Sequence, residues 1–123
     1  MPEIKCPKHL IEKTYSKRFL LWILRSLILG IFCLLIVLVA GGAGHGTLTP
    51  AYYLFPFALL VLFISNVGFG TSFIVFALSQ FLLYGALIGE SKSRSQEWIT
   101  IGIIAIIHVL AVVVAVRFYG DSI

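Results

Sequence analysis

Long runs of apolar residues alternate with short polar stretches along this chain. The first apolar run covers 19–40, the second is a block at 51–89 without any charge, and the third covers 98–118. A helix rises about 1.5 Å per residue, so crossing a hydrocarbon core of about 30 Å takes about 20 residues. In lipid a lone strand would leave its backbone unpaired, so the first and third runs each predict one membrane-spanning helix.

The block at 51–89 is too long for a single crossing, even a tilted one, and it must contain a reversal. The stretch at 65–72 supplies turn-forming residues, which are Asn66, Gly68 and Gly70. Both halves of the block are then long enough to cross the membrane. The block therefore predicts two spans joined by a short turn.

We therefore expect an all-α integral membrane protein, a compact bundle of four transmembrane helices. The bundle at 19–119 follows a basic juxtamembrane tail at 1–18 and precedes a short C-terminal tail at 120–123. The expected spans lie at about 19–40, 51–67, 71–89 and 98–118. An alternative interpretation has three spans, with 65–72 as the tip of a re-entrant hairpin.

Composition supports a membrane location. Of the 123 residues 60% are hydrophobic and 11% are charged, whereas about a quarter of the residues of a soluble domain are charged. The mean hydropathy is +1.08. We expect a multi-pass protein of the cell (inner or plasma) membrane.

The positive charges predict the orientation. Five of the nine Lys and Arg residues precede the first apolar run, so the N-terminus is expected in the cytoplasm. Four crossings return the C-terminus, with Arg117, to the same side but leave Lys92 and Arg94 outside. The three-span alternative reverses the positions of these three residues. Three cations are expected at lipid headgroups, namely Lys13, Lys17 and Arg18.

A glycine-rich linker with one histidine, His45, separates the first two apolar runs. It follows a predicted membrane helix, whereas a dinucleotide-binding glycine motif follows a strand. No Cys, Asp or Glu lies near His45 to complete a metal site. We interpret the linker as an outer turn that contains His45 and Thr47; Thr47 or Thr49 caps the next helix before Pro50, and His45 could face an outer cavity or a partner.

A few polar residues fall at the expected middle of the membrane, where each is costly unless paired. This mid-membrane polar layer comprises His108, Gln80, Ser79 and Cys33. One interpretation is structural, with a hydrogen bond between His108 and Gln80 that holds two helices together. The other is functional, with a titratable imidazole in a proton relay, ion path or ligand pocket.

Two further features concern helix contacts. Arg25 lies inside the first span, where it either reaches back to lipid phosphates or pairs with an acidic residue of another chain. Gly85 and Gly89 form a Gly-x-x-x-Gly pattern that allows close approach of helices, and we expect it to support packing of the third span on the fourth.

No pattern in the sequence predicts catalysis, a metal site, a cofactor or nucleic-acid binding, so we expect a non-enzymatic protein. The first hypothesis is a small membrane protein that acts through helix contacts, as an accessory subunit or as a protective or regulatory binder of another membrane component. The second is a homo-oligomeric channel or carrier for a small ion or solute, lined by the mid-membrane polar layer. The expected partners are the lipid bilayer and another membrane protein or further copies of this chain.

Overall fold

The computed structural model describes residues 8–42, 47–68 and 70–120, and all regular structure within them is helical. This confirms the predicted all-helical class. The helices are α1 (Lys8–Gly42), α2 (Thr49–Leu54), α3 (Pro56–Ser65), α4 (Thr71–Gly89) and α5 (Arg94–Gly120).

Three helices in the described ranges are long and apolar enough to cross a membrane. These segments are Tyr15–Gly42 in α1, Thr71–Gly89 in α4 and Arg94–Phe118 in α5. They contain the predicted first, third and fourth spans. A compact bundle of four spanning helices is not confirmed, because the predicted second span is interrupted.

The predicted span at 51–67 is split at Phe55, between α2 and α3. Pro56 has no backbone N–H, and its ring clashes with the carbonyl four residues earlier, so a helix cannot continue through it without distortion. A proline disfavours the helical conformation for the residue before it. Phe55 precedes Pro56 and accordingly has φ −131° and ψ 49°, outside the helical region. The longer piece, α3, has 10 residues, or about 15 Å, half of what a crossing needs.

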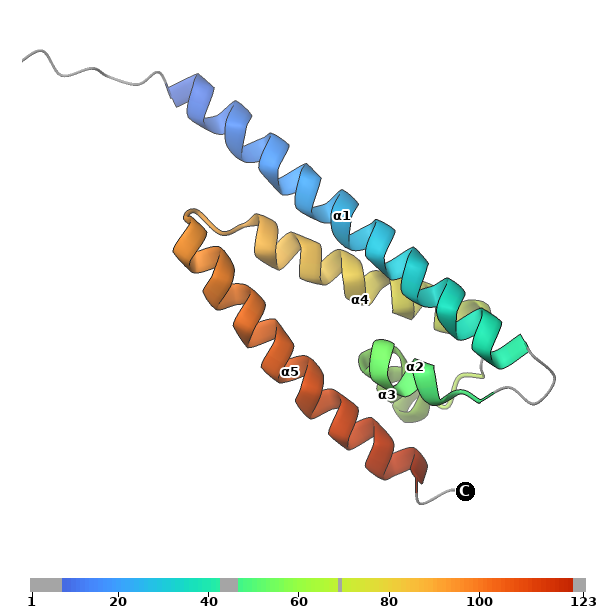
Figure 1. Ribbon diagram of the computed structural model, residues 1–123. Helices are drawn as coiled ribbons and strands as arrows, with labels where there is room; N and C mark the ends of the chain where they lie inside the picture. The colour runs from blue at the N-terminus through green and yellow to red at the C-terminus, as the bar shows by residue number, and fades with distance from the viewer. Residues whose placement is uncertain (1–7, 43–46, 69, 121–123) are drawn as a thin grey trace, which may run out of the picture.

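Helices α1 and α4 pack closely in antiparallel directions (Figure 1). Gly85 makes this approach possible, since a Cβ there would lie 2.8 Å from the carbonyl oxygen of Trp22 and 2.8 Å from Ser26 Oγ. Gly89 lies against Phe19 in the same way. The expectation that these glycines pack on the last span is therefore wrong: small-residue spacing marks a close approach but does not name the partner helix.

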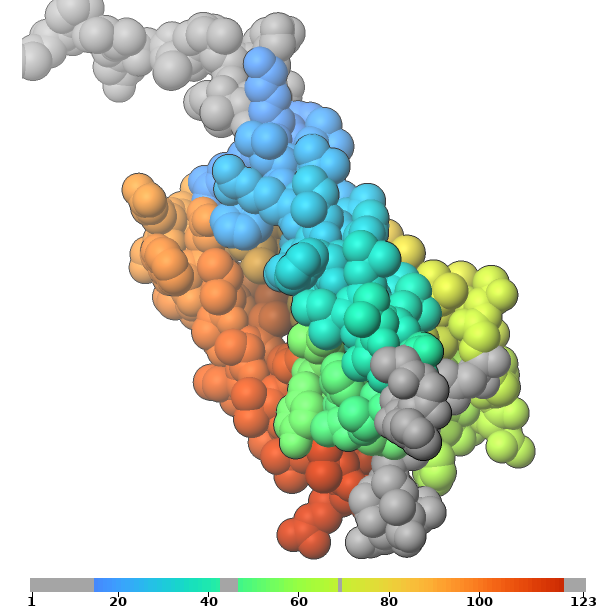
Figure 2. Space-filling view, turned by 45° about the vertical axis from the view of Figure 1, so that its right-hand side comes forward, coloured from blue at the N-terminus to red at the C-terminus, as the bar shows by residue number. Residues whose placement is uncertain are grey.

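Helix α5 runs alongside the other two long helices, and near its start an ion pair between Arg18 and Glu97 joins it to α1. Nowhere in their described parts do the Cα atoms of α1 and α5 come within 8 Å. At the far end α2 fills the gap, and it contacts both α1 and α5 (Figure 2).

Helices α2 and α3 together form a hairpin, residues 49–65, whose apex at Phe55 points into the molecule. The backbone of Tyr53, just before the apex, meets His108 in the middle of α5, whereas Phe63 near the end of α3 meets Phe118 near the end of α5. The chain thus enters and leaves the hairpin at the end of the molecule where α5 ends. The Phe55 ring is fully buried, with ring centroids 5.7 Å from Phe73 and 5.6 Å from Phe81, and it anchors the main apolar core.

Candidate functional site

The interrupted helix leaves backbone carbonyls at the apex of the hairpin that the next turn cannot pair. His108 Nε2 lies 2.8 Å from the carbonyl oxygen of Tyr53, and Gln80 Nε2 donates to that of Leu54 at 3.2 Å. An unpaired backbone group in hydrocarbon costs several kcal/mol. These two side chains, from α5 and α4, therefore hold the hairpin between them.

The contacts of His108 fix which ring nitrogen carries a proton. A carbonyl oxygen can only accept, so Nε2 must donate to Tyr53. Nδ1 lies 2.9 Å from the Tyr84 hydroxyl, and in the neutral ring it accepts from that hydroxyl. The Tyr84 and Phe57 rings pack edge-on around the imidazole, with centroids 6.0 Å and 6.4 Å away. Both nitrogens of a neutral, partly exposed His108 thus have hydrogen-bond partners within the chain.

The other residues of the predicted mid-membrane polar layer lie around this centre without forming one network. His108 and Gln80 bind neighbouring carbonyls of the hairpin, and no direct hydrogen bond joins them. Ser79 donates to the carbonyl of Val75 in its own helix at 2.7 Å. Cys33 is buried in the apolar core. The structure thus brings two of the four together, on the backbone of a third element.

Gln80 carries an unused acceptor. Within the described ranges its Oε1 is the one buried side-chain nitrogen or oxygen without a hydrogen-bond partner. The side chain is 6% exposed and borders a cavity of about 410 Å³ between α3, α4 and α5. Leaving a buried acceptor unpaired costs about 1–3 kcal/mol.

A larger cavity of about 560 Å³ lies between α1, α4 and α5, and we call it the slot. Its walls are mostly apolar and include Leu29 and Cys33 of α1, Phe81 and Tyr84 of α4, and Ala105 and His108 of α5. Leu54, next to the apex of the hairpin, lines its inner end. The volume falls within the range of about 300–1,000 Å³ that is common for ligand pockets.

The slot reaches only part of the way along the helices. Its lining on α1 runs from Trp22 to Cys33, which is about 16 Å at the rise of a helix. Beyond that depth the hairpin occupies the space between α1 and α5. The hairpin therefore closes the slot at one end, and toward the N-terminal end of α1 no described helix fills the gap between α1 and α5, so we call this the open end.

Arg25 lines the slot near its open end. Its guanidinium carbon lies 5.5 Å from the centroid of the Trp22 ring, one turn closer to the start of the helix. Arg25 has no ion-pair partner among the described residues, and the sequence has no Asp or Glu between Glu12 and Glu90. The only side-chain cation in the slot wall is thus uncompensated and directed toward the opening.

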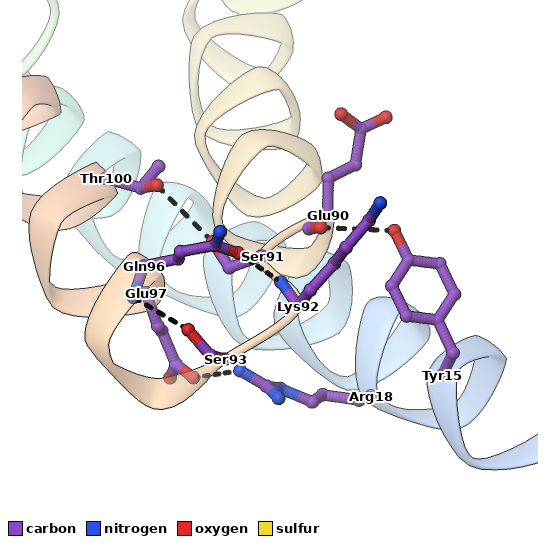
Figure 3. Close-up of polar contacts among 9 residues, drawn as sticks. All are labelled: Tyr15, Arg18, Glu90, Ser91, Lys92, Ser93, Gln96, Glu97 and Thr100. Carbon is purple, nitrogen blue, oxygen red and sulfur yellow. Dashed lines mark hydrogen bonds and ion pairs between the residues drawn. The ribbon is translucent and has the colours of Figure 1, made fainter. Parts of the chain in front are cut away.

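Polar contacts tie the start of α1 to the turn between α4 and α5, and we call them the rim (Figure 3). Arg18 pairs with Glu97 in the first turn of α5, where a negative charge also suits the helix dipole. The Tyr15 hydroxyl donates to the Glu90 carbonyl at 3.2 Å, and Ser91 Oγ lies 3.3 Å from Thr100 Oγ1. The rim thus joins α1 to the start of α5 at the open end of the slot.

The remaining predicted residues lie outside this centre. Lys17 is exposed, as headgroup contact requires, whereas Arg18 is engaged in the rim. Lys13 lies in α1, but its side chain is outside the described part, as is His45. Thr47 Oγ1 accepts a hydrogen bond from the backbone N–H of Thr49 at 3.0 Å. The expectation that Thr47 or Thr49 caps the next helix is wrong, because the N-cap of α2 is Leu48 and no side chain caps it.

The chain matches no protein-family model, no curated protein and no solved structure. Among the described residues, no three His, Cys, Asp or Glu side chains lie close enough together to hold a metal ion.

Sequence reasoning missed two residues of the site. Tyr84, which lies near the expected outer end of its span, follows Gln80 by four residues on one face of α4, and this spacing could have placed it beside the polar layer. Trp22 precedes Arg25 by three residues, a spacing at which side chains on a helix meet.

Proposed function

We propose that this chain is a non-enzymatic multi-pass membrane protein that binds another membrane component in the slot, as a protective or regulatory binder or an accessory subunit. The slot carries this proposal: it is apolar, of ligand size, closed at one end and open at the other. The polar side chains at its inner end support it too, because His108 bonds both to the Tyr84 hydroxyl and to the Tyr53 carbonyl of the hairpin.

We further propose a three-span topology in which the hairpin is re-entrant, entering and leaving the membrane on one side. Lys17, Arg18, Lys92 and Arg94 then share one side, and Arg117 lies on the other. Positive charges favour the cytoplasmic side, so the N-terminal end of α1 is cytoplasmic and the C-terminal end of α5 is external. The re-entrant tip is Phe55, whereas the sequence suggested 65–72.

Single-cysteine labelling distinguishes this topology from four spans. In a chain with Cys6→Ser and Cys33→Ser, we expect Ser95→Cys to be shielded from an impermeant maleimide in intact cells and Val67→Cys to react. A four-span chain gives the reverse result at both positions. The reverse pattern, with each cysteine reacting after permeabilisation, would refute the three-span proposal.

The homo-oligomeric channel remains a second candidate because of one observation, the unpaired Gln80 Oε1 beside the smaller cavity. A conducting path needs polar groups that face it, yet Gln80 Nε2 and both His108 nitrogens are bonded within the chain. We therefore place binding first.

The test of binding is to fill the slot. Ala105→Trp puts a large ring into the cavity, whereas Ile106→Trp adds the same ring at an adjacent exposed position that does not line it. We expect the wild type and Ile106→Trp, extracted in mild detergent, to carry a co-purifying component by native mass spectrometry. Ala105→Trp should lose it. Equal retention by Ala105→Trp and wild type, or a pure homo-oligomer that conducts ions in vesicles, would contradict the proposal.

A further inference from the structure

We infer that the slot holds one acyl chain of an anionic phospholipid from the leaflet at the N-terminal end of α1, with the lipid phosphate at Arg25. The inference rests on the proposed binding function and names its ligand. Three features of the slot lead to it: its depth, its lining and the position of its one cation.

Depth excludes a transmembrane helix as the occupant. A spanning helix must cross about 30 Å of hydrocarbon and is about 10 Å wide. The slot extends about 16 Å from Trp22 to Cys33 and ends at the hairpin beside Leu54. A partner helix would therefore collide with the hairpin halfway across. A lipid tail enters from one leaflet and reaches only about half the membrane thickness, as the slot does.

The lining suits a hydrocarbon tail. Leu29, Cys33 and Ala105 present apolar side chains along the walls. The polar atoms at the inner end are already paired, since His108 binds both the Tyr84 hydroxyl and the Tyr53 carbonyl. A tail in the slot therefore leaves no hydrogen bond of these residues broken.

The charge selects the headgroup. Arg25 has no carboxylate partner within the described part, whereas Arg18 is already neutralised by Glu97. A guanidinium presents paired donors that match two phosphate oxygens. Its position over Trp22, toward the open end, brings it nearer to the headgroup layer. An anionic phospholipid thus supplies the ion-pair partner that Arg25 lacks among the described residues.

The experiment measures lipid retention by the full chain. Nanodiscs contain equal amounts of phosphatidylglycerol and phosphatidylcholine, and native mass spectrometry counts the lipids that remain on the released protein. We expect one retained phosphatidylglycerol per chain for the wild type. Arg25→Gln should lower the preference for phosphatidylglycerol by about tenfold, since a charge-assisted hydrogen bond contributes more than the 1.4 kcal/mol that a tenfold change requires. Arg117→Gln, at the opposite end, should leave the preference unchanged.

Ala105→Trp should lose the retained lipid of either type, and Ile106→Trp should keep it. Equal retention of both lipids by the wild type would overturn the inference, as would unchanged retention by Ala105→Trp. If a neutral molecule or a protein is retained instead and is lost with Ala105→Trp, binding in the slot stands and the lipid assignment falls. If nothing is retained by the wild type, both fail.

A second measurement needs no substitution in the slot. In a chain with Trp98→Phe, Trp22 is the remaining tryptophan. We expect phosphatidylglycerol with brominated acyl chains to quench its fluorescence more than brominated phosphatidylcholine at the same fraction in a mixed bilayer. Equal quenching by the two lipids would also overturn the inference.

Discussion

Replacing His108 tests whether the hairpin depends on side chains from the spanning helices. His108→Leu introduces an apolar side chain of similar reach and removes two hydrogen bonds, to the Tyr53 carbonyl at 2.8 Å and the Tyr84 hydroxyl at 2.9 Å. Hydrogen bonds between membrane helices contribute about 0.6 kcal/mol on average and up to about 1.7 kcal/mol. Because the Tyr53 carbonyl cannot regain a partner within its own interrupted helix, we expect a loss of about 2 kcal/mol.

The assay is reversible unfolding of the purified protein in mixed micelles with increasing dodecyl sulfate, followed by far-ultraviolet circular dichroism. His108→Gln is the informative companion variant, because its amide still donates toward the Tyr53 carbonyl but has no imidazole. We expect it to recover about half of the loss. Ser79→Ala serves as the control, since Ser79 bonds within its own helix, and it should stay within about 0.5 kcal/mol of wild type.

Two results would refute this reasoning. If His108→Leu unfolds within about 0.5 kcal/mol of wild type, the hairpin does not depend on this contact. If His108→Gln is fully stable but loses a measurable activity, His108 acts through its titration and the functional interpretation of the mid-membrane polar layer replaces the structural one.

Three further variants probe other parts of the fold by the same unfolding assay. Gly85→Val should cost about 1–3 kcal/mol or more, because its Cβ meets the Trp22 backbone at 2.8 Å, and an unchanged midpoint would contradict the close packing of α1 and α4. Phe55→Ala should cost about 3 kcal/mol through the cavity left at the apex, whereas a cost below about 1 kcal/mol would mean that the apex is not packed. Arg18→Gln should cost at most about 1 kcal/mol, because the pair with Glu97 is partly exposed and screened by salt; a larger, salt-independent loss would contradict this view of the rim.

The sequence predicted the parts of the fold that depend on segment length and polarity. The helical class and the three long helices follow from apolar runs whose lengths match a membrane. Their partners do not follow, because lipid-facing and protein-facing residues are equally apolar. Gly85 is an example: its spacing predicted a close contact but not that α1 would make it.

The sequence predicted two polar residues of the candidate site but not the backbone groups to which they bind. Depth along the helices placed His108 and Gln80 at one level, and both do meet the same element. That element is the backbone of the hairpin. The hydrophobicity of 51–67 alone predicts a continuous membrane-spanning helix there. Pro56 was the available signal, since proline in a helix interior frees carbonyls that other side chains must then satisfy.

Pro56 also accounts for the slot. A continuous helix at 51–67 would cross the membrane and fill the space between α1 and α5 along its whole length. Interrupted at Phe55, the chain turns back, and the hairpin fills only the half of that space nearest Gly42. The unfilled half is the slot, with the hairpin as its closed end and the uncompensated Arg25 near its opening. One interruption of a helix thus creates both the carbonyls that Gln80 and His108 bind and a cavity whose lining on α1 is about 16 Å long.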